Sequence, residues 1–156
     1  MKEIILMLHP TFGVLGIISA FWVLVETLNA SDKNRNRICI ASIFVTVFMV
    51  LTWIAGGYWY VVHYAVDKAV ILKGPWPFAH NFFMETKEHL FFMTLVLSLF
   101  LPMVVWMNNL ASNRSARIVV FTVTAFIILS ALALEGAGSV IAMGVKLGLV
   151  HGAGAL

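Results

Sequence analysis

The sequence predicts an all-α integral membrane protein, a four-transmembrane-helix bundle that forms a single membrane domain over residues 1–156. Three observations lead to this prediction. Of the 156 residues, 62% are hydrophobic and only 11% are charged, and the mean hydropathy of +0.98 is too high for a soluble domain of this size. Four apolar stretches are long enough to cross a hydrocarbon core, which takes about 20 helical residues. None of them shows the alternating pattern of a membrane β-strand.

The predicted helices follow these four stretches, and connecting segments separate them. In lipid, every backbone N–H and C=O group needs a partner within the protein, so each stretch is expected to be a helix rather than part of an open sheet. The connection over 65–88 contains Gly74-Pro75-Trp76-Pro77, which breaks a helix, and it is predicted to be an outer loop that folds over the membrane surface. The helices are expected over residues 4–28, 38–64, 89–107 and 118–138, with an extension of the last toward 150.

The basic residues indicate the orientation of the chain. Every arginine falls in one of the two short connections, 29–37 and 108–117, and short loops rich in arginine stay in the cytoplasm. Both termini are then expected on the outer, periplasmic side of a bacterial inner (cytoplasmic) membrane, which the chain crosses several times. Because the charges lie between apolar runs rather than along one face, the lipid bilayer is an expected partner and nucleic acid is not.

The first stretch has an alternative interpretation as a secretory signal peptide, because Asn29-Ala30-Ser31 loosely resembles a cleavage site. Two features favour a retained helix. A signal peptide enters with its amino end inside, whereas the basic segment that follows this stretch is expected to stay inside, and His9-Pro10 interrupts the apolar region.

Three histidines are expected at a similar depth, near the outer ends of three different helices. Counting about 20 residues outward from each inner connection leads to His9 on the first helix and to His89 on the third. On the second helix the count ends about one turn before His63. The single cysteine, Cys39, excludes an internal disulfide, a covalent CxxCH haem site and a cysteine-rich metal site within one chain. A metal or haem would therefore depend on His, Met, Glu or Asp. The remaining histidines are expected to be interfacial residues of a loop and a tail: His80 and His151.

Small residues share a helix face with two of these histidines. Gly13 and Gly16 lie on the face of His9, and Gly56 lies on the face of His63. A flat macrocycle needs such a gap between helices, so these glycines are candidate cofactor-binding positions. The alternative is that they allow close helix packing without any ligand.

Carboxylates accompany the histidines near the outer side. Glu85 and Glu88 precede His89 in the pattern E-x-x-E-H, where a carboxylate can hydrogen-bond the second ring nitrogen of a ligating histidine; the alternative is an ordinary charged helix start. Glu135 lies within the last apolar stretch, where an ionisable group is costly. It is a candidate metal ligand, proton relay or quinone contact, with interfacial water as the alternative partner.

The histidines predict a cytochrome b-type electron-transfer subunit that holds one haem b, or two, near the outer face through His9, His63 and His89. The general layout resembles the small haem-b membrane anchors of respiratory complexes. That resemblance implies transfer of electrons between the quinone pool and a membrane or periplasmic redox partner. Subunits with two stacked haems need histidines near both faces, and this chain has none on the inner side.

Two alternatives to haem remain open. Three histidines with Glu135 or Glu85 would also suit a copper, zinc or iron site. A transport, proton-relay or scaffold subunit of a larger membrane complex is the other alternative, and it rests on Glu135 and on the Gly-rich segment after it. An electron-transfer subunit of an oxidoreductase complex is favoured over an enzyme that acts alone.

Overall fold

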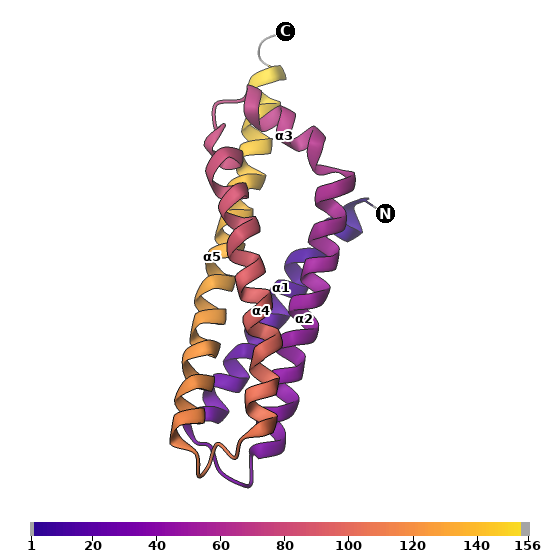
Figure 1. The fold of residues 1–156 in the computed structure, drawn as a ribbon. Helices are drawn as coiled ribbons and strands as arrows, with labels where there is room; N and C mark the ends of the chain where they lie inside the picture. The colour runs from indigo at the N-terminus through magenta and orange to yellow at the C-terminus, as the bar shows by residue number, and fades with distance from the viewer. Residues whose placement is uncertain (1, 154–156) are drawn as a thin grey trace.

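The structure, a computed structural model, describes residues 2–153, and all of the regular elements in this part are helices (Figure 1). Within it, four helical segments are long and apolar enough to cross a membrane. The predicted all-helical chain with four helices of spanning length and composition is confirmed. In chain order the elements are α1 (Lys2–Leu28), α2 (Arg35–Val62), α3 (Tyr64–Lys73), the π-helix η1 (Ala79–Met84), α4 (Glu85–Met107) and α5 (Arg114–Ala153).

The four long helices pack side by side as a bundle (Figure 1). Both α1 and α4 pack against α2 and α5, and the faces turned inward form one continuous apolar core. The short connections 29–34 and 108–113 lie together at one end of the bundle, where the Asn109 amide donates a hydrogen bond to the Asp32 carboxylate at 3.0 Å. This end is the loop end. α1 begins and α5 ends toward the opposite end (Figure 1).

The segment 65–88 is not the loop that the sequence predicts. α3 and η1 occupy most of it, and η1 continues directly into α4. Tyr64 and Ile71 of α3 and Ala79 of η1 are buried and form a second apolar cluster, and Ile141 of α5 packs against them. The short helices are therefore held by burial of their apolar faces on the far part of α5.

This end of the molecule is named the cap, which consists of α3, η1 and residues 139–153 of α5. The last helix, α5, runs to Ala153, and its final turns give α3 and η1 a surface to pack on. Gly74, which follows α3, and Gly148 of α5 allow these two helices to lie close together, because a methyl group added at Gly74 would lie 2.8 Å from Cα of Gly148. The break after α3 follows the predicted Gly-Pro-Trp-Pro signal, but the partner surface lies about 70 residues further along the chain and has no local signal.

Candidate functional site

His9 of α1 is held against α2 in the half of the bundle nearer the cap. Its Nδ1 lies 3.0 Å from the carbonyl oxygen of Thr52. Because a carbonyl only accepts, Nδ1 carries the hydrogen, and Nε2 of the neutral ring is left with a free lone pair. The ring lies directly over Gly56, where an added methyl group would lie 2.7 Å from two ring atoms.

Lys87 of α4 reaches the free nitrogen of this imidazole. Its Nζ lies 3.5 Å from Nε2 of His9, and it also lies over Gly138 of α5, 3.1 Å from where a methyl group would stand. Lys87 is 20 residues before the end of α4 at Met107, which is about 30 Å from the loop end at 1.5 Å per residue. A lysine at this depth faces the interior of the bundle rather than solvent.

Glu135 of α5 completes the group, which is named the His9–Lys87–Glu135 cluster. Its carboxylate packs directly on Gly13 of α1, where an added methyl group would require the carboxylate to move. Glu135 and Lys87 are close enough for their charges to interact. Among the described residues, however, they form no ion pair within 4.0 Å. A gap of this kind between charged groups is commonly bridged by water.

An unpartnered hydroxyl lies on the residue that holds His9. The Oγ1 atom of Thr52 is buried and has no hydrogen-bond partner in the described part of the chain, although the carbonyl of the same residue binds His9. Buried hydroxyls are normally satisfied by protein or by ordered water. The polar groups around His9 therefore have hydrogen-bonding capacity that the protein itself does not fill.

The three histidines expected to converge do not meet. His63 lies at the junction of α2 and α3, where its ring packs on Trp59 at a centroid distance of 4.9 Å. His89 is exposed on α4 and donates from Nδ1 to the carbonyl oxygen of Glu85 at 2.7 Å. In residues 2–153 no three His, Cys, Asp or Glu side chains are grouped so that they could hold a metal ion.

The gaps beside the glycines contain side chains of the protein itself. Glu135 fills the space beside Gly13, the His9 ring fills the space beside Gly56, and Met49 fills the space beside Gly16, where an added methyl group would lie 2.9 Å from its Cε. A macrocycle could enter along this stripe only if those side chains moved. As arranged, the glycines serve close contacts between side chains and neighbouring helices.

The carboxylates of the E-x-x-E-H pattern also have partners other than those expected. The Glu85 side chain faces His80 of η1 at 3.8 Å, and only its backbone carbonyl contacts His89. Glu88 is exposed and lies near Tyr60 of α2. His80, expected to be interfacial, is instead buried in the cap.

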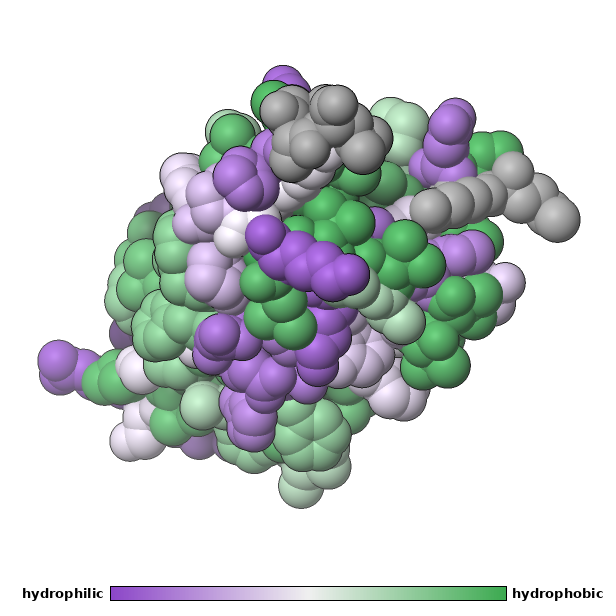
Figure 2. Space-filling view, turned by 90° about the horizontal axis from the view of Figure 1, so that it is seen from above, coloured by the Kyte–Doolittle hydropathy of each residue, from purple (hydrophilic) through white to green (hydrophobic). Residues whose placement is uncertain are grey.

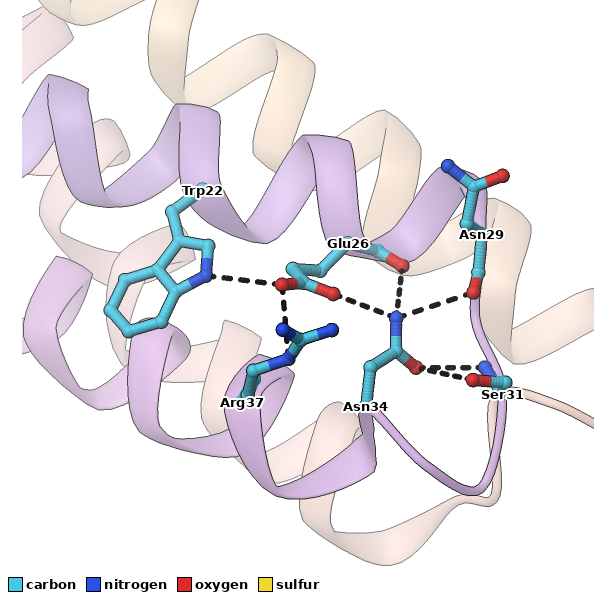
Figure 3. Close-up of polar contacts among 6 residues, drawn as sticks. All are labelled: Trp22, Glu26, Asn29, Ser31, Asn34 and Arg37. Atoms are coloured by element: carbon cyan, nitrogen blue, oxygen red, sulfur yellow. Dashed lines mark hydrogen bonds and ion pairs between the residues drawn. The ribbon is translucent and has the colours of Figure 1, made fainter.

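A second polar cluster lies at the loop end, where α1 turns into α2 (Figure 3). The buried amide of Asn34 accepts from the Ser31 N–H at 2.8 Å and donates to one carboxylate oxygen of Glu26 at 2.8 Å. Nε of Arg37 lies 3.2 Å from the other carboxylate oxygen, and Nε1 of Trp22 donates to that oxygen at 3.4 Å. Both oxygens of Glu26 are therefore satisfied by neighbours, and this loop-end cluster joins the two helices.

Three comparisons, with protein-family models, with curated proteins and with solved structures, gave no match to this chain.

Proposed function

We propose that this protein is a multi-pass membrane subunit that takes up and releases protons through the His9–Lys87–Glu135 cluster. The observation that carries the proposal is that ionisable side chains from three helices come together inside the bundle, at a depth where each is costly. Ionisable groups inside a membrane segment commonly line pathways for protons, ions or substrates. The unpartnered hydroxyl of Thr52 beside them supports a place for water in the same region.

The chemistry needs the three side chains of the cluster and water. A proton can pass from Nζ of Lys87 to Nε2 of His9, which breaks an N–H bond of the ammonium and forms an N–H bond on the ring. The imidazolium keeps its Nδ1–H on the carbonyl of Thr52, so the ring does not need to turn. Glu135, which interacts with Lys87, first takes up a proton from water, and its O–H bond then breaks as an N–H bond forms again on the neutral lysine. The imidazolium of His9 releases its Nε2 proton to water and returns to the neutral ring. The transfer across the remaining gap runs through water.

The same proposal includes the orientation of the chain, with the cap on the outer face of a bacterial inner membrane. All four arginines of the chain lie at or beside the loop end, which favours a cytoplasmic position for that end. Viewed from above the cap, hydrophilic side chains gather near the middle of the face (Figure 2). That surface suits contact with water, and the cluster then lies just inside the outer boundary of the membrane.

Proton flux into liposomes tests the proposal directly. The purified protein is reconstituted around a trapped pH-sensitive dye, and an electrical potential drives protons inward. The wild-type protein is expected to accelerate acidification of the liposome interior, whereas Glu135→Gln and Lys87→Met are expected to reduce the rate to that of protein-free liposomes. Matched controls are Glu3→Gln and Lys146→Met, both at exposed positions, which should retain the wild-type rate. A wild-type rate no higher than that of empty liposomes would overturn the proposal.

Haem b, or a copper, zinc or iron ion, is the second candidate, with quinone and a membrane or periplasmic redox subunit as partners. One observation favours it. His9 and His89 each donate Nδ1–H to a backbone carbonyl, which is the arrangement that leaves Nε2 ready to ligate a metal. At His9 this would require Lys87 to leave Nε2.

The visible spectrum of the purified protein, oxidised and then reduced with dithionite, tests this second candidate together with metal analysis. A sharp reduced α band with a Soret shift would support haem b, and a stoichiometric metal without such bands would support a non-haem site. If the protein shows neither these bands nor a stoichiometric metal, this second candidate is removed and the proton proposal is unaffected.

A further inference from the structure

A second group of ionisable side chains lies in the cap, separate from the His9–Lys87–Glu135 cluster. The hydroxyl of Tyr64 in α3 lies 3.0 Å from Nδ1 of His80 in η1, and Nε2 of His80 faces the carboxylate of Glu85 at 3.8 Å. Tyr64 and His80 are each only 4% exposed. His80 belongs to a π-helix, a rare element that occurs frequently at functional sites.

The carboxylate of Glu85 favours one tautomer of the neutral His80 ring. An imidazole nitrogen that faces a carboxylate is favoured as the N–H, so Nε2 carries the hydrogen and Nδ1 is the acceptor. Tyr64 then donates its hydroxyl hydrogen to Nδ1 of His80. Burial raises the pKa of Tyr64 above its usual range, and Tyr60, Glu88, Asp67 and Glu85 act in the same direction. The phenol is therefore neutral and keeps the proton until a base takes it.

We propose that Tyr64 is a redox-active tyrosine and that His80 is its proton acceptor. In the step, a one-electron oxidant outside this chain removes one electron from the phenol ring and is itself reduced by one electron. At the same time the Oη–H bond of Tyr64 breaks and an Nδ1–H bond forms on His80. The products are a neutral tyrosyl radical and an imidazolium. A one-electron reductant reverses the step and returns the proton to Tyr64.

The charges around the pair favour the products. Oxidation with proton transfer leaves one added positive charge on His80, and a buried positive charge needs a negative partner. Glu85 faces that ring directly, and the acidic side chains of Glu88 and Asp67 act on the neighbouring phenol. Without His80, the Tyr64 hydroxyl would either keep its proton during oxidation or lose it to water. The burial of Tyr64 opposes loss of the proton to water.

Tyr60 offers a route for the electron to the protein surface. Its ring stacks on that of Tyr64 at a centroid distance of 5.2 Å and an interplanar angle of 21°, and it is 40% exposed. The external oxidant that fits this arrangement is a one-electron redox centre, such as a metal ion or haem of a partner, placed near α2 and the cap. This inference is independent of the proton pathway through the bundle.

Flash oxidation of the purified protein tests the inference. The probe is tris(bipyridine)ruthenium(III), a one-electron oxidant generated by light, and the product is followed by its tyrosyl absorption and by electron paramagnetic resonance. The wild-type protein is expected to give a tyrosyl radical that Tyr64→Phe abolishes and that Tyr60→Phe retains but forms more slowly. His80→Gln is expected to slow its formation by about 100-fold, the contribution typical of a positioned general base.

The glutamine variant also separates the chemical role from a structural one. Its side-chain oxygen can still accept the Tyr64 hydroxyl hydrogen, so the cap should remain folded, but an amide does not take up the proton. Three outcomes would each overturn the inference: no radical in the wild-type protein, a radical that persists in Tyr64→Phe, or an equal rate in His80→Gln.

Discussion

The loop-end cluster and the His9–Lys87–Glu135 cluster use similar residue types in opposite ways. At the loop end, both carboxylate oxygens of Glu26 and the amide of Asn34 have partners from the protein. In the other cluster, Lys87 has a long contact with His9 and no ion pair with Glu135 among the described residues. The first arrangement joins helices, and the second leaves polar groups with hydrogen-bonding capacity that the described residues do not fill, as the proposed proton exchange requires.

Position within the bundle reinforces this difference. The loop-end cluster lies beside the turn between α1 and α2, where water is close and satisfied polar groups cost little. The His9–Lys87–Glu135 cluster lies about 30 Å from that end, between the bundle core and the apolar cluster of the cap. An incompletely satisfied cluster in such a place lowers stability, which favours a role other than structural support.

The largest effect on stability is expected at the loop end, from Asn34→Ala. The change leaves the Ser31 N–H and one oxygen of Glu26 without partners, which should lower the free energy of unfolding by about 2 to 3 kcal/mol. Unfolding in detergent measures this effect, and Asn36→Ala, at an exposed position of the same helix, is the matched control. Proton flux per folded molecule should not change. A loss of flux that matches the loss of stability would mean that the two clusters do not have separate roles.

A smaller loss of stability with a larger loss of function is expected from Gly56→Ala. The added methyl group would lie 2.7 Å from the His9 ring, so the ring must move and the hydrogen bond to the Thr52 carbonyl is lost. Overpacking of this kind costs about 1 to 3 kcal/mol. The neighbouring Gly57 has nothing within 4 Å of an added methyl group, and Gly57→Ala should be neutral or stabilise the helix by about 0.5 to 1 kcal/mol. Equal effects of the two variants on flux would argue against a functional role for the His9 ring.

The sequence predicts the bundle well because hydropathy and depth can be counted along one chain. Four apolar runs are sufficient to predict four spanning helices. The same counting predicts a shared depth for His9 and Glu135, which both lie in the cluster. The cap was missed, because the apolar residues of α3 and η1 are buried against a part of α5 that is distant in the sequence.

The direction in which a side chain points is harder to predict than its depth, because it depends on the neighbouring helices. His63 and His89 are at the cap end of the molecule, but one lies at a helix junction and the other is exposed. Lys87 precedes Thr94 by seven residues and therefore shares its helix face. Only the structure shows that Thr94 is buried and that this face points inward. The surrounding Glu85, Glu88 and His89 made this segment resemble an ordinary solvated helix start.

The smallest effects are expected from two buried hydroxyls, and they distinguish the clusters most sharply. Thr27 follows Glu26 at the loop end and Thr52 holds His9, and the Oγ1 atom of each has no hydrogen-bond partner in the described part of the chain. Thr27→Val removes an unsatisfied buried polar group and should raise the free energy of unfolding by about 1 kcal/mol. Thr52→Val also removes the water-binding hydroxyl of the proposed pathway and should change the free energy of unfolding by less.

Proton flux should then separate the two threonine variants. Thr27→Val should leave the flux unchanged, because the loop-end cluster has no part in proton transfer. Thr52→Val should lower the flux without lowering the stability of the protein, because in the proposed pathway its hydroxyl binds the water that links Lys87 and Glu135. If both variants gain stability and keep the wild-type flux, then no water depends on Thr52, and the transfer between Lys87 and Glu135 must instead be direct, through movement of the lysine side chain.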